Sequence, residues 1–270
     1  EGESATDFAR RLADQLEARI VELGPETVAA FVAEPVVGAS LGSQPAPAGY
    51  FKHVREICDR YGVLLIADEV MCGMGRTGSL FALEQEGICA DITTMAKGLG
   101  AGYQPIAAVM ARQSVIEAIM AGSGNLWNGH TYMSHAVATA GALAVLQEVE
   151  SRDLLSAVRT RGQQLETALR DRFGQHAHVG DIRGRGLFWS IELVADCDSK
   201  TPFDVSRNLE GKIQRAAMEA GMICYPSQGC ADGTAGDHVL LAPAFTSPPE
   251  EIEMTVEMLG TAVDGVIAEG

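Results

Sequence analysis

The stretch VLLIADEVMCGMGRTGSLFALEQEGICADITTMAKGLGAG, residues 63–102, decides the fold of this 270-residue chain. It contains two short apolar runs, residues 63–67 and 92–95, each bounded by turn residues. Such runs are typical of strands that are buried on both faces of a parallel sheet. The first run ends at the carboxylate of Asp68, and the second ends just before Lys97 and three glycines.

The spacing of the two runs suits one strand–crossover–strand unit, which is about 30 residues long. If the two strands are parallel, Asp68 and Lys97 lie just beyond the carboxyl ends of neighbouring strands. That edge is where open α/β sheets bind their ligands. The sequence therefore predicts a crevice that holds an acid and an amine. Glu69, beside Asp68, receives no separate role from the pattern.

Two kinds of cofactor site compete for this stretch. Residues 73–78, GMGRTG, form a GxGxxG string, the fingerprint of a dinucleotide-binding turn. In that fingerprint the first glycine directly follows the strand, whereas residues 68–72 intervene here. Gly87 also interrupts the helix that should follow the string. A nicotinamide oxidoreductase is therefore kept only as an alternative.

The combination of a lysine and an acid favours a pyridoxal phosphate site. This cofactor needs a lysine for a Schiff base and an acidic partner for its pyridine nitrogen. A carboxylate at that nitrogen favours the protonated ring, because opposite charges stabilise each other in a partly dry site. Lys97 and Asp68 fit these two cofactor-binding and catalytic roles. Once the substrate amine has released it, Lys97 can act as general base and then as general acid.

At these residues the chain resembles a known family. The segments DEVMCGMGRTG, residues 68–78, and DITTMAKGLGAGYQPIAAVMA, residues 91–111, resemble the class III pyridoxal phosphate-dependent aminotransferases. This is the omega-amino-acid, ornithine and GABA aminotransferase group, and the resemblance extends from about residue 28 to about residue 252. It implies an aspartate-aminotransferase-like α/β fold (PLP fold type I). In that fold a mostly parallel sheet has helices on both faces, and a smaller α+β carboxyl-terminal domain follows.

The order of the segments predicts the same organisation. Strand-like and helix-like segments alternate in the first part, which favours a mostly parallel sheet covered by helices. We place a boundary near Ser151: residues 1–150 form part of the large cofactor-binding domain, and residues 151–270 a small domain with fewer strands. The family carries a Gly-Ser phosphate loop and a stacking aromatic that residues 1–62 do not supply. By this resemblance the chain corresponds to the carboxyl-terminal portion of such an enzyme.

The resemblance also implies roles for three further residues. Val70 would pack on the cofactor ring, although a valine there is also ordinary core. Glu34, in a Glu34-Pro35 pair that closes a strand, would line the substrate pocket, with a turn carboxylate as the equal alternative. Thr131, in the segment NGHTYMSH, would reach the cofactor phosphate of the neighbouring subunit in a homodimer or dimer of dimers. The alternative for Thr131 is a local turn hydrogen bond.

Two departures from the family pattern bear on the substrate. Met71 stands where many relatives have a glutamine that bonds the ring oxygen of the cofactor. Leu240 stands where many relatives have an arginine that binds the substrate carboxylate through two hydrogen bonds. Arg183 and Arg185 are the basic residues that could take its place. We therefore expect an amine or omega-amino acid as donor and a small 2-oxo acid as acceptor. A racemase, an aminomutase or an inactive fragment is the alternative.

Composition narrows the partners and the compartment. The net charge of −16 argues against nucleic acid and anionic membranes as partners. The six cysteines include no CxxC pair, which favours reduced thiols in a cytoplasmic protein over a disulfide framework or a metal site. No apolar run approaches about 18 residues, so no membrane span is predicted.

Overall fold

The computed structural model describes residues 2–269, which form two compact units. The first unit comprises the residues up to Pro35, Ala46–Gly75 and Ser79–Arg152. The second comprises Val36–Pro45, Arg76–Gly78 and the chain from Asp153 on. Two short segments of the amino-terminal part therefore pack within the second unit, which a single boundary near Ser151 does not anticipate.

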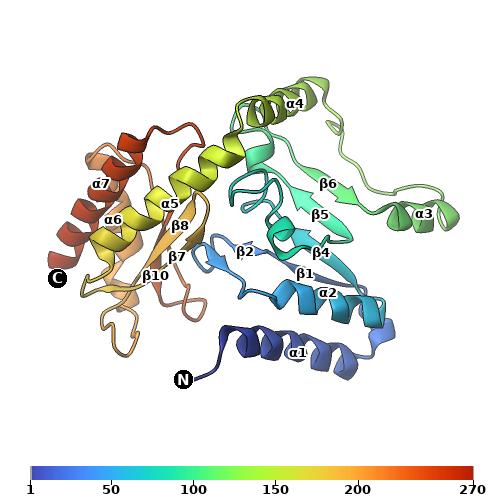
Figure 1. Ribbon diagram of the computed structural model, residues 1–270, viewed down its shortest axis with the longest axis horizontal. Coiled ribbons are helices and arrows are strands. Elements are labelled where there is room, and N and C mark those ends of the chain that lie inside the picture. Colours follow the sequence, from blue (N-terminus) through green and yellow to red (C-terminus); the bar gives the residue numbers. More distant parts are fainter. Residues whose placement is uncertain (1, 270) are drawn as a thin grey trace. The chain divides into compact units, whose positions relative to one another are not determined.

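The first unit is a four-stranded sheet with helices packed against it (Figure 1). The strand order is β1 (Ala30–Ala33), β4 (Leu64–Asp68), β5 (Ile92–Met95) and β6 (Ala108–Ala111). The helices are α1 (Ala5–Leu23), α2 (Tyr50–Tyr61), α3 (Gln113–Ala121) and α4 (Ala136–Ser151). Three short 3-10 helices are η1 (Pro25–Thr27), η2 (Ala82–Glu86) and η3 (Lys97–Leu99).

Three of these four strands are parallel. β1 pairs with β4 up to the pair Ala33↔Ala67, and β4 pairs with β5 up to the pair Asp68↔Thr94. β6 runs antiparallel to β5. The predicted mostly parallel sheet is thus confirmed. Because parallel strands end at one edge, the residues that follow β1, β4 and β5 are brought together there.

Helices α1 and α2 lie side by side and cover one face of this sheet (Figure 1). Ile20 of α1 and Ile57 of α2 pack with Leu65 of β4 in one buried cluster. Each such fully buried side chain stabilises the fold by about 1.5–3 kcal/mol. Helix α2 ends at Gly62, whose φ of +70° is a left-handed conformation that glycine adopts without strain. The apolar spacing of α2 and its glycine cap together determine where the chain turns into β4.

The second unit is built on an antiparallel sheet in the order β7 (Val179–Arg185), β8 (Phe188–Leu193), β10 (Asp237–Leu241) and β9 (Tyr225–Gln228). Its helices are α5 (Leu154–Phe173), α6 (Leu209–Glu219) and α7 (Pro249–Ala268), with the 3-10 helix η4 (Val205–Arg207). A small ribbon pairs β2 (Val36–Val37) with β3 (Gln44–Pro45).

Within the described residues 2–269, the part from residue 151 on holds four strands, β7 to β10, and the earlier part holds six, β1 to β6, so the later part has fewer strands, as predicted. The strand β7 is hard to recognise in the sequence, because its stretch VGDIRGR contains two glycines and therefore has low intrinsic strand propensity. The glycine at 184 is needed for a close approach, because a Cβ there would lie 2.3 Å from the carbonyl oxygen of Phe188. Pairing with β8 thus overrides the local preference.

The two faces of this second sheet differ in chemistry. Trp189, Ile191 and Val239 face an apolar core that also contains residues of α5, α6 and α7. On the polar face, the residues 36–45 lie over the strands: Arg183 Nε donates to the carbonyl of Gly42 at 2.8 Å. This face therefore holds charged side chains that are closed off by a segment from the amino-terminal part.

Two neighbouring ionisable residues in β10 are buried, and their pKa values shift in opposite directions. His238 is fully buried, and neither ring nitrogen has a hydrogen-bond partner among residues 2–269. Burial, aided by the charge of Arg183, lowers the pKa of His238 to about 4. Burial, aided by Glu210 and opposed by a hydrogen bond from Gln228, raises the pKa of Asp237 to about 6.

These shifts predict opposite pH dependences for two variants. Between pH 6.5 and 4 the unfolded chain protonates His238 before the folded chain does, so acidification destabilises the fold by up to about 3 kcal/mol. Between pH 6 and 3.8 the folded chain keeps the Asp237 proton that the unfolded chain loses, which stabilises the fold on acidification by a similar amount.

Relative to wild type, His238→Leu should therefore gain free energy of unfolding as the pH falls from 6.5 to 4, and Asp237→Asn should lose it. Urea unfolding at several pH values measures both differences. If the free energy of unfolding depended on pH in the same way in all three proteins, the pKa shifts of His238 and Asp237 would be contradicted.

Candidate active site

Three of the predicted site residues follow the ends of three neighbouring parallel strands. Glu34 directly follows β1, Asp68 is the last residue of β4, and Lys97 is the second residue after β5. The register places these strand ends side by side, with Asp68 opposite Thr94 of β5. The structure thus brings an acid, a second acid and an amine to one edge of the sheet.

The carboxylate of Asp68 is half-buried and is held at one oxygen. Its Oδ1 accepts hydrogen bonds from the backbone N–H of Val70 at 3.0 Å and from the hydroxyl of Thr94 at 3.3 Å. Its Oδ2 accepts none from the part of the chain that the structure describes. A carboxylate fixed in this way presents one open oxygen to a charged hydrogen-bond donor.

Lys97 combines an exposed side chain with an unusual backbone. Its φ of +41° lies in the left-handed region, which residues with a Cβ rarely adopt. Its carbonyl accepts the N–H groups of Gly100 and Ala101, each at 3.1 Å, and so begins the turn of η3. Its amine forms no ion pair or hydrogen bond within residues 2–269. Strain that the surrounding turn maintains is typical of functional sites.

Glu69 is fully buried, and sequence reasoning missed its role. Its Oε2 accepts the backbone N–H of Ala82 at 2.7 Å, and its Oε1 accepts that of Leu83 at 3.0 Å. Burial raises the pKa of Glu69, while these two hydrogen bonds and one from the Cys72 thiol oppose the rise. These partners lie 13 and 14 residues further along the chain, so no local sequence motif predicts the two hydrogen bonds.

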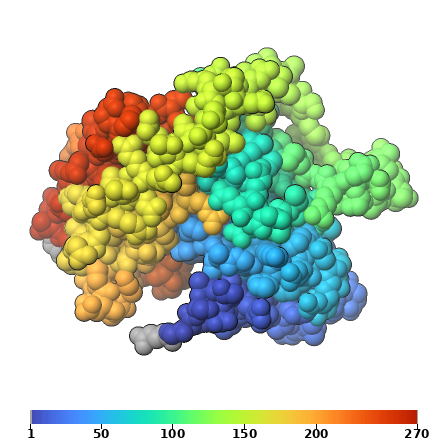
Figure 2. Space-filling model, in the orientation of Figure 1, coloured from blue at the N-terminus to red at the C-terminus, as the bar shows by residue number. Residues whose placement is uncertain are grey.

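The other two predicted cofactor residues differ in how the structure places them. Val70 is half-buried and is tied to Asp68 by its backbone N–H. Thr131 is exposed, and its hydroxyl forms no hydrogen bond within residues 2–269. It lies in the connection between α3 and α4, and Figure 2 shows the green segment with α3 standing out from the rest of the first unit. Trp127 and Tyr132 of this connection are 84% and 81% exposed.

The GMGRTG string forms a turn and no dinucleotide site. It is followed by the five-residue η2, so no α-helix begins there to hold a diphosphate group. Within the second unit, Arg76 donates to the carbonyls of Leu187 at 3.0 Å and Pro243 at 2.7 Å. Its guanidinium lies 4.6 Å from the ring centroid of Phe245. Burial lowers the pKa of Arg76 to about 10, and the residue has a structural role.

The basic residues of the RGRG segment are also bonded within the protein. Arg183 donates to the carbonyls of residues 41 and 42 and pairs with Asp181 at 3.0 Å and with Glu192. Leu240, which we expect to stand in place of an arginine found in many relatives, is 4% exposed. Arg183 therefore binds backbone carbonyls and carboxylates of its own unit and does not bind a substrate.

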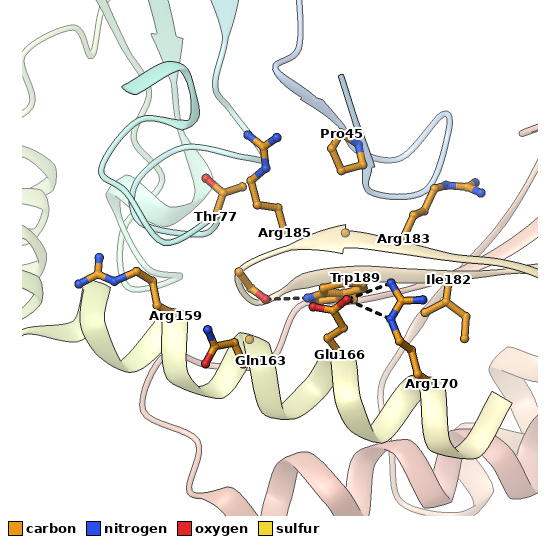
Figure 3. A pocket seen from close by; sticks show the side chains of 13 residues that line it. Pro45, Thr77, Arg159, Gln163, Glu166, Arg170, Ile182, Arg183, Arg185 and Trp189 are labelled. Atoms are coloured by element: carbon orange, nitrogen blue, oxygen red, sulfur yellow. Dashed lines mark hydrogen bonds and ion pairs between the residues drawn. The ribbon is translucent and has the colours of Figure 1, made fainter. Parts of the chain in front are cut away.

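A groove of about 490 Å³ in the second unit lies outside the predicted site (Figure 3). Residues of α5 and of the β7–β8 hairpin line it, among them Arg159, Arg170 and Trp189. Arg170 pairs with Glu166 at 2.9 Å, and Arg159 donates to the carbonyl of Gly78 at 2.7 Å. Because these cations are bonded within the protein, the groove is not a ready anion site.

The sequence matches the family described as "Aminotransferase class-III" over residues 2–263. This chain belongs to the class-III aminotransferase family. It is 47% identical over 264 residues to a protein from Gibberella zeae named "Aminotransferase", a match that covers 97% of this chain and 52% of that protein. It is 37% identical over 265 residues to "Vanillin aminotransferase" from Capsicum frutescens, covering 97% of this chain and 56% of the relative.

A solved structure supports the same assignment at the level of the fold. The (S)-enantioselective omega-transaminase from Thermomicrobium roseum superposes with a TM-score of 0.91 and 34% identity, covering 99% of this chain and 57% of that one. The predicted aspartate-aminotransferase-like α/β fold is thereby confirmed. The chain spans a little more than half the length of each of these relatives. No helix within residues 2–269 is both long and apolar enough to cross a membrane.

The position of Arg76 predicts a large effect on stability. Arg76→Gln should lower the free energy of unfolding by about 2–4 kcal/mol, because the carbonyls of the buried Leu187 and the half-buried Pro243 lose a charged donor. Urea unfolding at pH 7 measures this loss. Arg215→Gln is the matched control, since Arg215 is exposed on α6 of the same unit, and it should change stability by less than about 0.5 kcal/mol. Equal effects of the two substitutions would contradict the structural role.

Proposed function

We propose that this protein is a pyridoxal phosphate-dependent aminotransferase that moves an amino group from an amine or omega-amino acid to a small 2-oxo acid. The observation that carries the proposal is the meeting of Asp68 and Lys97 at one sheet edge in a chain of the class-III family. The open oxygen of Asp68 and the unpaired amine of Lys97 fit the two groups that hold this cofactor. When bound, pyridoxal phosphate supplies an electron sink for the negative charge that develops on the substrate carbon.

Each residue at the edge has a distinct task in this proposal. Asp68 would hold the pyridine nitrogen of the cofactor through its open oxygen, because Val70 and Thr94 fix Oδ1. Lys97 would hold the cofactor through its amine, and its Nζ, once free, would act as the general base and then the general acid for the proton of the substrate carbon. Val70 packs on the cofactor ring, and Glu34 lines the substrate pocket beside the end of β1.

The donor class is inferred from the second unit. Leu240 is buried and carries no charge, and Arg183 is already paired, so neither forks a substrate carboxylate. One solved neighbour is an omega-transaminase, and its name supports an amine-type donor. Vanillin, for which one relative is named, is an aldehyde whose aminated form is an amine without a carboxylate, and this agrees with such a donor. A small 2-oxo acid is the acceptor that completes the exchange of the amino group.

We also propose the domain roles and the compartment. Residues 1–150 belong to the large cofactor-binding domain and residues 151–270 to the small one. A cytoplasmic location is supported by the cysteines, since none within residues 2–269 forms a disulfide. Burial raises the pKa of Cys58, Cys224 and Cys230 to about 11, which keeps these thiols protonated and unreactive.

The first test identifies the lysine that binds the cofactor. Borohydride reduction of the protein with bound pyridoxal phosphate should attach the cofactor irreversibly to Lys97, which peptide mass spectrometry locates. Lys97→Ala should abolish the label, whereas Lys52→Ala, which removes an exposed lysine of α2 in the same unit, should not change it. A label on another lysine would refute the assignment. Without an acceptor, inversion of the substrate stereocentre would instead indicate a racemase, and a shift of the amino group within one molecule would indicate an aminomutase.

We further propose that the protein forms a homodimer in which residues 122–133 complete the site of the partner. Leu126, Trp127 and Tyr132 are 70%, 84% and 81% exposed, and large apolar side chains exposed together are typical of protein interfaces. Within residues 2–269, the hydroxyl of Thr131 forms no hydrogen bond that would explain its position. A twofold dimer would provide two equivalent sites, each with a threonine from the other subunit.

Mixed dimers test this arrangement. Thr131→Asp places like charge against the cofactor phosphate, so this variant and Lys97→Ala should each be inactive alone. In a mixed dimer one site carries both lesions and the other carries neither, so equal mixing should restore about a quarter of wild-type activity. Mixing Lys97→Ala with Asp68→Asn is the control, because both lesions lie in the subunit's own site and activity should not return. No recovery in the first mixture, with mixed dimers shown to form, would contradict the shared site.

A further inference from the structure

Glu69 is a buried carboxylate beside Asp68 that takes no part in the proposed chemistry. We propose that Glu69 is a positioning residue: it holds the loop of residues 69–83 closed, and thereby fixes Asp68 and, through Met74, the backbone at Lys97. This inference rests on the proposed function, because it concerns how the same cofactor site is kept in shape. Three links, each within the first unit, connect Glu69 to the cofactor site.

The first link closes the loop at its base. The two oxygens of Glu69 accept the N–H groups of Ala82 and Leu83, the first two residues of η2. Ala82 is fully buried and Leu83 is 3% exposed, so water does not replace these bonds. A hydrogen bond from an N–H to a charged oxygen is stronger than one between neutral groups, and two such bonds join the ends of this loop.

The second link connects Glu69 to Asp68. The N–H of Glu69 donates to the carbonyl of Thr94 at 3.0 Å, and the N–H of Gly73 donates to the carbonyl of Glu69 at 3.0 Å. A Cβ at Gly73 would lie 2.6 Å from that carbonyl oxygen and 3.0 Å from Oε2, so the chain wraps tightly around the residue. Hydrogen bonds therefore fix both the backbone and the side chain of Glu69. Because Asp68 is the preceding residue, its backbone is fixed as well.

The third link leads to Lys97. Met74, which lies in the closed loop, is 4% exposed and packs with Met95 and Leu99. A Cβ added to Gly98 would lie 2.9 Å from the Cβ of Met74, so the methionine abuts the residue after Lys97. Met74 itself has a φ of +54°, a conformation that a methionine keeps only when its surroundings enforce it. The closed loop therefore holds the strained turn at Lys97 from one side.

The chemistry of the link requires a carboxylate. Glu69 forms no ion pair with a cation among residues 2–269, so its charge is stabilised by the two backbone N–H groups and the thiol of Cys72. A glutamine has the same size but only one acceptor oxygen, and its NH₂ group would face one of the two N–H groups. Glu69→Gln therefore breaks one bond at the base of the loop and leaves the volume unchanged.

The experiment measures cofactor affinity and loop protection in the protein that carries this chain. Glu69→Gln should raise the dissociation constant of pyridoxal phosphate at least about tenfold and accelerate amide hydrogen exchange at residues 82 and 83. Glu84→Gln is the matched control: this exposed glutamate accepts the N–H of Phe81 at 3.1 Å beside the same 3-10 helix. It should change the dissociation constant by less than about twofold. If Glu69→Gln does not fold, Glu69→Asp takes its place, since it keeps both oxygens and shortens their reach.

A double-mutant cycle with Asp68→Asn separates positioning from a general loss of stability. If Glu69 acts through Asp68, the two substitutions together should raise the dissociation constant at least about fivefold less than the product of their separate effects. Effects that simply multiply would overturn the inference, as would wild-type affinity in Glu69→Gln. A wild-type protein that does not retain pyridoxal phosphate would refute the proposed function itself. If the wild-type protein retains pyridoxal phosphate and Glu69→Gln binds it equally well, only the positioning role of Glu69 is refuted. The two failures are therefore distinguishable.

Discussion

The parallel pairing of β4 with β5 is the constraint on which the site depends. Only a parallel register places the last residue of β4 opposite Thr94, so that the acid and the amine leave the sheet at one edge. An antiparallel pairing of the same two strands would send Asp68 and Lys97 to opposite ends. The crossover that makes the strands parallel is the loop that contains the five-residue 3-10 helix η2 in place of an α-helix.

This loop explains why buried polar groups are retained in the first unit. A carboxylate without a cation is expensive to bury, and Glu69 is tolerated because two backbone N–H groups meet its oxygens. The bonds replace the regular helix that would otherwise organise a crossover. Three residues with a side chain have positive φ in this region: Met74 in the crossover loop, and Lys97 and Ala101 in the turn after β5. Stability and chemistry therefore depend on the same few atoms.

The second unit uses buried polar groups differently. Arg183 holds the backbone of residues 41 and 42 over the polar face of the sheet, and Arg76 holds the turn at residue 187. A Cβ at Gly42 would lie 2.6 Å from the ring of His238, which shows how closely this segment covers the strand. Because Arg183 and Arg76 form these contacts within the protein, they do not bind a substrate carboxylate. Packing in this unit thus contributes directly to the proposed choice of an amine-type donor.

The sequence by itself determined the family-level pattern: two apolar runs that end at Asp68 and Lys97, the spacing of a parallel crossover, and the helix α2 with its glycine cap. These features are local, so periodicity and turn residues reveal them. Only the tertiary structure decided the role of Glu69, the strand β7 and the use of Arg183. Each depends on partners far along the chain: backbone N–H groups 13 and 14 residues away, a neighbouring strand that overrides glycine, and carbonyls 141 and 142 residues distant. No local propensity encodes such partners, because they meet only when the chain has folded.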